Sequence, residues 1–198
     1  VRLVGSEMCI RDRLITKLNE KSVIAVDTET SSLNPQEADL VGISLCYEAN
    51  EAFYIPVGHT EKTELKKDIV LKKLKPLLED PSIKKVGQNI KYDFIIFKNH
   101  GIELSSVEDT MLLSYTLDAG NNRHNMDTLS ELHLGHKTIS YKDLVGTGKK
   151  QLNFSEVDLK SATEYAAEDA DITLRLYEVL SERVSKEKLE KIYEEFEK

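Results

Sequence analysis

Acidic residues at the ends of predicted strands are the best candidates in this chain for catalysis or metal binding. Asp27 and Glu29 lie two positions apart, where an apolar run over residues 23–26 passes into a polar string. Side chains two apart on a strand leave the same face, so we expect both carboxylates to point one way. Alone, such a pair is more often a solvated strand end or a helix cap than a site.

Two further stretches carry acidic groups at useful spacings. Asp93 comes four residues after Asn89, where a predicted strand turns into a helix. The structural interpretation of this pair is that Asn89 caps the helix and Asp93 favours its dipole. Tyr165 and Asp169 lie one helical turn apart and share a face, whereas Asp171 points elsewhere. A Tyr/Asp pair at this spacing is usually a surface hydrogen bond.

The expected positions of these groups in the fold favour a metal site. Asp27, Glu29 and Asp93 fall at or just past strand ends, where open α/β sheets place their sites. A late helix that brings in Asp169 completes a cluster of four carboxylates, which cannot all stay ionised without cations. Oxygen ligands select hard ions, so we expect Mg²⁺ or Mn²⁺, with Zn²⁺ as the alternative at one site. Two such ions are the usual machinery for in-line phosphodiester cleavage.

The elements that must position these groups follow from the apolar pattern. Short β-prone runs predict strands over residues 23–26, 41–47, 52–57 and 83–86, with a short fifth strand from Val107. The brief link between the second and third runs predicts an antiparallel hairpin. Helical spacing predicts helices over residues 65–78, 92–99, 109–117, 126–134 and 158–184, and a charged helix from residue 186. A three-strand meander followed by helix–strand alternation predicts a mixed α/β sheet.

Composition narrows the function classes. The 198 residues suit one domain with its own core. Asp plus Glu number 35 against 27 Lys plus Arg, a net charge of −8, which argues against a protein that coats duplex DNA non-specifically. It leaves open a nucleic-acid enzyme whose carboxylates hold metal ions. Two cysteines exclude a disulfide framework, and no apolar run approaches the ~20 residues of a membrane helix, so we expect no membrane partner.

The first 13 residues fit nothing that follows. They lack the apolar stretch of a secretory signal. We interpret residues 1–13 as an extraneous leader, with a short native helix as the alternative, and assign the domain to residues 14–198.

Three stretches, in this order, resemble the exonuclease motifs of the proofreading domain of bacterial DNA polymerase I, a family A polymerase. They read DTET over residues 27–30, GQNIKYD over 87–93 and YAAEDAD over 165–171. The third is the tyrosine variant within the DnaQ-like group, because the histidine type would place its His at Glu164. Intervening stretches over residues 109–115, 123–127 and 151–154 match as well, so the resemblance runs from about residue 20 to 183.

The resemblance implies a ribonuclease H-like α/β fold, with a five-stranded mixed sheet flanked by helices. It also implies 3′→5′ exonuclease activity on DNA, as the proofreading part of a polymerase used in replication and repair. The implied partners are a single-stranded or frayed DNA 3′ end and a polymerase domain of the same parent chain, to which the C-terminal helix would lead. We expect a monomer in the bacterial cytoplasm.

The resemblance also assigns roles to individual residues. Two divalent metal ions would be bound by Asp27, Glu29, Asp93 and Asp169. Tyr165 would orient the attacking water. Contacts to the substrate would come from Thr28, Leu33, Gln88, Asn89 and Phe154.

Three alternatives stay open. A ribonuclease D-like RNA exonuclease would use identical carboxylates, although the stretches between the motifs favour the polymerase family. A catalytically silent scaffold domain would have lost carboxylates, whereas all four and Tyr165 are present here. A nucleotide-binding module with an incidental acidic cluster would show no dependence on divalent ions.

Overall fold

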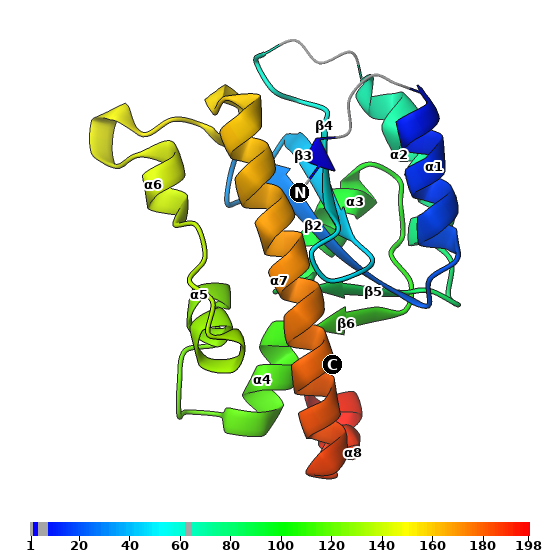
Figure 1. Cartoon of the computed structure of the whole chain (residues 1–198), viewed down its shortest axis with the longest axis vertical. Helices are drawn as coiled ribbons and strands as arrows, with labels where there is room; N and C mark the ends of the chain where they lie inside the picture. Colours follow the sequence, from blue (N-terminus) through cyan, green and yellow to red (C-terminus); the bar gives the residue numbers. More distant parts are fainter. Residues whose placement is uncertain (1, 4–7, 62–64) are drawn as a thin grey trace.

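The computed structural model describes residues 2–3, 8–61 and 65–198, and its centre is a sheet with the strand order β1–β4–β3–β2–β5–β6 (Figure 1). The strands are β1 Arg2–Leu3, β2 Val23–Thr30, β3 Leu40–Cys46, β4 Ala52–Pro56, β5 Lys84–Gly87 and β6 Val107–Asp109. β2 pairs antiparallel with β3 and parallel with β5, so the sheet is mixed, as predicted. The short link between β3 and β4 forms the predicted antiparallel hairpin.

The five predicted strands correspond to β2 through β6. A sixth strand, β1, pairs parallel with β4 and comes from the segment that the sequence set apart as a leader. The first helix, α1, spans Met8–Asn19 and so also begins inside that segment. Residues 1 and 4–7 of the same segment lie outside the described residues.

The predicted helices are present with small shifts at their ends. They are α2 Lys67–Leu78, α3 Lys91–Asn99, α4 Thr110–Asp118, α5 Met126–Leu129 and α7 Leu159–Lys186. The helix expected over residues 126–134 is α5 continued by a π-helical turn, Ser130–Leu134, which ends at Gly135 in the left-handed region. A further short helix, α6 Tyr141–Val145, had no apolar period long enough to predict it.

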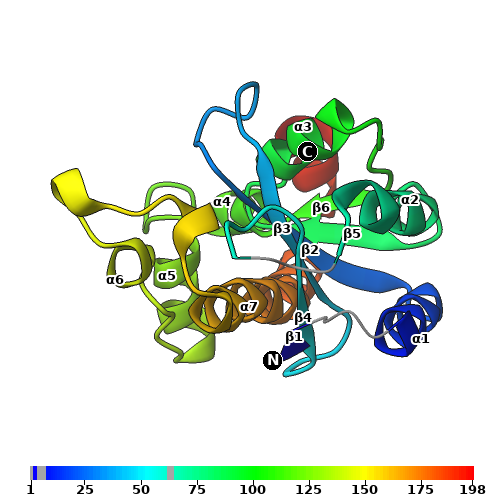
Figure 2. The same cartoon turned by 90° about the horizontal axis from the view of Figure 1, so that it is seen from above.

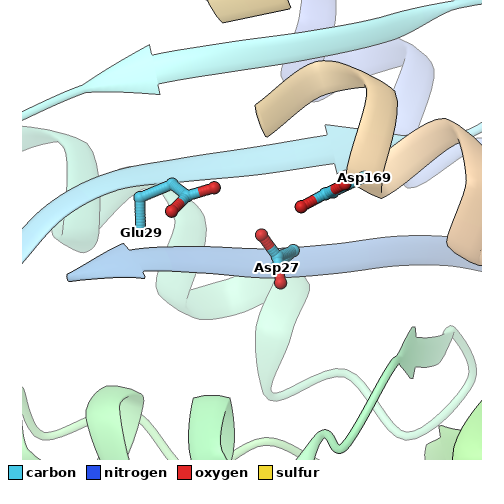
Figure 3. Close-up of side chains that lie close together, drawn as sticks. All are labelled: Asp27, Glu29 and Asp169. Atoms are coloured by element: carbon cyan, nitrogen blue, oxygen red, sulfur yellow. The ribbon is translucent and has the colours of Figure 1, made fainter. Parts of the chain in front are cut away.

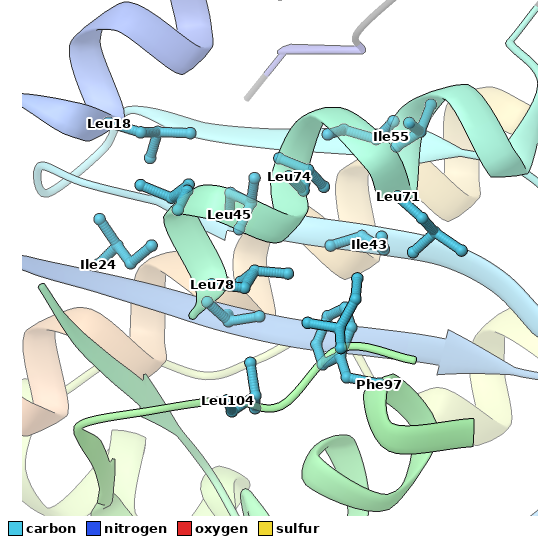
Figure 4. Close-up of a cluster of buried hydrophobic side chains, with 14 of the residues drawn as sticks. Leu18, Ile24, Ile43, Leu45, Ile55, Leu71, Leu74, Leu78, Phe97 and Leu104 are labelled. Carbon is cyan, nitrogen blue, oxygen red and sulfur yellow. The ribbon is translucent and has the colours of Figure 1, made fainter. Parts of the chain in front are cut away.

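One face of the sheet carries the main hydrophobic core, under α1, α2 and α3 (Figure 4). The alternation of β2 sends Ile24 and Val26 into this core, where both are fully buried. Burial of this apolar surface is the main stabilising contribution to the fold. The same alternation sends the next acidic residues of β2 to the opposite face.

The opposite face of the sheet is covered by the long helix α7 (Figure 2). Its contact surface is made of small residues, since Ala167 and Ala170 pack against Ala25 and Ala52 of the sheet. Alanine allows a helix to pack close to a sheet, because its side chain is a single methyl group. This close approach sets where the polar residues of α7 meet the end of β2.

The chain beyond α7 is helical, as expected, but it turns back instead of continuing straight. Lys188 adopts a left-handed φ of 58°, after which come α8 Glu190–Ile192 and a π-helical turn, Tyr193–Glu197. Tyr193, the first residue of this turn, has a buried side chain. Its hydroxyl accepts a hydrogen bond from the Asp109 amide of the edge strand β6. The charged tail therefore covers the edge of the sheet with one buried aromatic side chain.

We predict that Leu45→Ala lowers the free energy of unfolding by about 2–5 kcal/mol, because it leaves a cavity in the core. Leu33→Ala is the matched control, since Leu45 is 0% exposed and Leu33 is 95% exposed. The control should change stability by no more than about 0.5 kcal/mol. Urea denaturation followed by circular dichroism measures both, and equal losses would contradict this description of the core.

Candidate active site

The end of strand β2 presents two carboxylates on the face covered by α7. Asp27 and Glu29 follow Ala25 at alternate positions, so all three side chains share that face. Asp27 pairs with Ser44 of β3, whose hydroxyl donates to Asp27 Oδ2 over 3.4 Å. The ladder between β2 and β3 shifts register after Glu29, which marks the point where β2 leaves the regular sheet.

Helix α7 brings a third carboxylate to this point. Asp169 extends from α7 toward Asp27 and Glu29, and oxygens of the three groups all lie within 4.8 Å of one another (Figure 3). Glu29 is buried, while the other two are half-buried. No other group of three potential metal ligands occurs in the part of the chain that the structure describes. The arrangement offers several anionic oxygens to one small cation.

Asp93 lies on the other side of β2 and outside this close group. Its Oδ1 accepts hydrogen bonds from the Thr28 amide over 2.9 Å and from the Thr28 hydroxyl over 2.5 Å. The amide is available because the parallel pairing with β5 stops at Ala25. The structure thus brings three of the four predicted ligands together and holds the fourth next to them through Thr28.

These bonds bear on the expectation that Thr28 offers its backbone amide to the substrate. In this structure the amide donates to Asp93, so a contact to a terminal phosphate or sugar would replace or share that bond. Thr28 holds the Asp93 carboxylate beside the other three carboxylates.

The carboxylates resist ionisation when no cation is present. Burial raises the pKa of Asp27 from 3.8 to about 6, against the opposing effect of the Ser44 hydrogen bond. Burial raises the pKa of Glu29 well above its usual range, and repulsion from Asp27 and Asp169 raises it further. Burial and the charge of Asp27 likewise raise the pKa values of Asp93 and Asp169. A divalent cation would reverse this repulsion.

Tyr165 precedes Asp169 by one turn of α7 and lines the same cleft. Its phenol lies near the Asp169 carboxylate, and this proximity lowers the pKa of Asp169 against the larger effect of burial. Burial and the nearby carboxylates raise the pKa of Tyr165, so the phenol stays protonated. The Tyr165 hydroxyl is therefore a protonated group beside the carboxylates.

The carboxylates open into a cleft of about 840 Å³. All five predicted substrate-contact residues line it, but with very different exposure. Leu33 stands out into solvent at 95% exposed, whereas Phe154 is 1% exposed. The Phe154 ring stacks against Tyr141 with 6.5 Å between ring centroids, so little of Phe154 is left for a base to stack on. Tyr141, which was not predicted, is the exposed aromatic residue of this wall.

Gln88 and Asn89 lie together on the opposite wall. The Gln88 side chain is already used, since it accepts from the Thr110 hydroxyl and donates to the His124 carbonyl over 2.7 Å. Asn89 has a φ of 61° and its side chain lines the cleft. Its backbone amide donates to Asp109 Oδ1 over 2.9 Å. Of these two side chains, that of Asn89 is the one open to a ligand, while Gln88 braces the loop.

Two residues that the sequence did not single out hold the segment that carries Leu33. Tyr92 donates its hydroxyl to the Ser32 carbonyl over 2.5 Å, and the Asn153 side-chain amide donates to the Ser31 carbonyl over 2.8 Å. Tyr92 lies inside the stretch over residues 87–93 and Asn153 beside Phe154, so their positions near matched motifs were the available signal. Both residues bond to partners far away in the sequence, and local sequence patterns do not predict such contacts.

None of the helices in the described part of the chain has the length and apolar character needed to cross a membrane.

The fold is shared with nucleases of known structure. Trypanosoma brucei RNase D matches with a TM-score of 0.74 at 20% identity, over 96% of this chain and 71% of its own. Brucella melitensis NrnC matches with a TM-score of 0.71 at 24% identity, over 88% and 79% of the two chains. The predicted ribonuclease H-like fold is confirmed.

Similarity in sequence identifies the family more narrowly than similarity in fold does. DNA polymerase I of Rhizobium leguminosarum is 44% identical over 94% of this chain, and that of Pseudomonas aeruginosa is 46% identical over 87%. Each match covers 20% of the relative, so the chain spans about a fifth of the length of these proteins. A 3′-5′ exonuclease family model matches residues 10–185. The chain thus belongs to the 3′-5′ exonuclease family of DNA polymerase I, a family of hydrolytic nucleases.

Proposed function

We propose that this domain removes nucleoside 5′-monophosphates one at a time from DNA 3′ ends, by hydrolysis that depends on two divalent ions. The observation that carries the proposal is the convergence of Asp27, Glu29 and Asp169 within 4.8 Å, beside a cleft that Asp27 and Glu29 line. DNA is the proposed substrate because the similar proteins are DNA polymerases. In that setting the activity is proofreading, in replication and repair.

The donor set fits hard divalent ions. One ion would be held by Asp27, Glu29 and Asp169, and a second mainly by Asp27, with Asp93 in its outer shell. Oxygen-only ligands favour Mg²⁺ or Mn²⁺, with Zn²⁺ as the alternative at one site. When bound, such ions supply a water of lowered pKa and stabilise the charge of the leaving oxygen.

The protein side chains do the positioning. Tyr165, which stays protonated and lines the cleft near the carboxylates, would orient the attacking water. Leu33 projects over the cleft, where it can stack against the last bases, and Asn89 offers a polar contact opposite. Stacking on apolar groups accepts every base, which suits removal of any terminal nucleotide. A mispaired end would be selected because it frays at lower cost.

We infer that the natural partner of this domain is a polymerase domain in the same parent chain. The relatives that match over nearly all of this chain are about five times longer. The domain itself is assigned to residues 14–198, as a monomer acting in the bacterial cytoplasm.

We predict that the protein shortens a 5′-labelled single-stranded DNA from its 3′ end in Mg²⁺. EDTA and the variant Asp27→Ala/Glu29→Ala should each abolish the ladder, because metal position and charge stabilisation fail together. Denaturing gel electrophoresis gives the measurement. An intact ladder in the folded variant would contradict the proposed site.

A parallel RNA strand of the same sequence separates the proposal from ribonuclease D-like activity. Faster shortening of the RNA would favour the RNA-trimming alternative. No ladder on either strand, with folded protein and several divalent ions, would favour a scaffold domain.

We predict that Tyr165→Phe lowers kcat on the order of 10²-fold, because the water loses its orienting donor while the ring is kept. Tyr177→Phe, on the same helix but bonded to Lys84, is the matched control and should leave kcat unchanged. Single-turnover digestion measures both rates. Equal kcat values for the wild type and Tyr165→Phe would remove Tyr165 from the mechanism.

We predict that the metal-free protein loses stability as the pH rises from about 4 through 6. The folded-state pKa of Asp27, about 6, exceeds its ordinary 3.8, so the folded state binds more protons in this window. Mg²⁺ should raise Tm at pH 7.5 and less at pH 5. Asp27→Asn/Glu29→Gln should flatten this part of the pH profile and abolish the Mg²⁺ effect.

Differential scanning calorimetry across the pH series makes these comparisons. Glu131→Gln, which neutralises an exposed carboxylate, is the control and should keep the wild-type profile. A double variant with an unchanged pH profile would show that the carboxylates do not repel one another as described.

A further inference from the structure

Asp109 is a buried carboxylate that the proposed chemistry does not use, and it binds the wall of the cleft. Its Oδ1 accepts from the Asn89 amide over 2.9 Å, and its Oδ2 accepts from the Ile90 amide over 3.0 Å. The same Oδ1 accepts from Met111 N over 2.9 Å, at the start of α4. One side chain therefore satisfies amides at the N-termini of both α3 and α4.

The backbone it holds is unusual. Asn89 has a φ of 61°, in the left-handed region that side chains other than glycine adopt at a cost. Such a conformation persists where the surroundings fix it, and here two charge-assisted hydrogen bonds do so. The position of Asn89 at the cleft wall thus depends on Asp109.

Asp109 is in turn held by the C-terminal segment. The Asp109 backbone amide donates to the Tyr193 hydroxyl over 3.2 Å, and that hydroxyl donates to Glu108 Oε2 over 2.8 Å. Lys198 Nζ lies 3.0 Å from Glu108 Oε1. Tyr193 is 3% exposed and packs with residues of α4 and α7. A continuous set of contacts runs from the segment after α7 to the Asn89 loop.

We propose that Asp109 is a positioning residue for the DNA 3′ end, acting through Asn89, and that Tyr193 of the C-terminal segment keeps Asp109 in place. The inference rests on the proposed function, because it takes Asn89 as a contact to the terminal nucleotides. It adds that the segment after α7 contributes to substrate binding without touching the substrate. A ground-state contact of this kind acts on KM and Kd and leaves kcat nearly unchanged.

The test is a double-mutant cycle on binding of a fluorescein-labelled single-stranded DNA in EDTA, measured by anisotropy. Asp109→Ser keeps a side chain that caps α4 and loses the reach to the Asn89 loop. Asp109→Ser and Asn89→Ala should each raise Kd about three- to tenfold, the size expected for a lost hydrogen bond. Tyr193→Phe, which keeps the buried ring, should raise it less. In the Asn89→Ala background, Asp109→Ser should add little, because the two residues act as one unit.

Two controls separate positioning from stability. Asp158→Ala removes the exposed cap of α7, whose carboxylate accepts from Ser161 N, and should leave Kd unchanged. In the Mg²⁺ reaction, Asp109→Ser should raise KM with kcat within about twofold. Amide exchange of Asn89, followed by NMR, should be faster in Asp109→Ser than in the wild type.

The outcomes distinguish the two levels of inference. Wild-type protein that neither binds nor shortens single-stranded DNA would overturn the proposed function and this inference with it. An active wild type in which Asp109→Ser raises Kd by the same factor with and without Asn89 would overturn the positioning role alone. An unchanged Kd in Tyr193→Phe would remove the C-terminal segment from it.

Discussion

Three carboxylates that repel one another are kept within 4.8 Å because helix α7 packs on the sheet through small side chains. The contact surface of α7 is built from alanines such as Ala167 and Ala170, which face small residues of the sheet. Larger side chains at these positions would push the helix outward and carry Asp169 away from Asp27. The hydrophobic packing of one helix thus opposes the repulsion between the carboxylates, which protonation or a bound cation relieves.

Strand β2 serves both faces of the sheet at once. Its alternation directs Asp27 and Glu29 toward α7, while Thr28 between them binds Asp93 from α3. The opposite position to Glu29 on β3 is Gly42, where a Cβ would lie 2.1 Å from the Tyr54 hydroxyl. Strand β2 therefore positions four side chains. The period of two along the strand sets Asp27, Thr28 and Glu29. Asp93 binds the Thr28 amide, which is free because the pairing with β5 ends at Ala25.

Local pattern was enough for much of this molecule. Alternation along residues 23–30 and the four-residue spacing of Tyr165 and Asp169 predicted which side chains share a face, and motif order gave the family. Phe154 looked like a stacking surface, yet its ring is enclosed by Tyr141 and other aromatics, which no one-dimensional pattern reports. Asp109 and Tyr193 escaped notice for the same reason, since their partners lie about 20 and 84 residues away. Long-range hydrogen bonds leave no periodic trace in a sequence.

The crowding of acidic groups around Asp27 also bears on how this sequence can change over time. In the absence of metal, repulsion between the carboxylates is expected to lower the stability of the fold. A substitution that removes one of them would reduce this repulsion and would also remove a proposed metal ligand. Selection for stability alone would favour their loss. Without a need for the reaction, loss of Asp27, Glu29 or Asp169 would therefore be favoured by stability, whereas Asp93 would still be retained by its hydrogen bonds to Thr28. Stability alone therefore gives no reason for Asp27, Glu29 and Asp169 to occur together in one cluster.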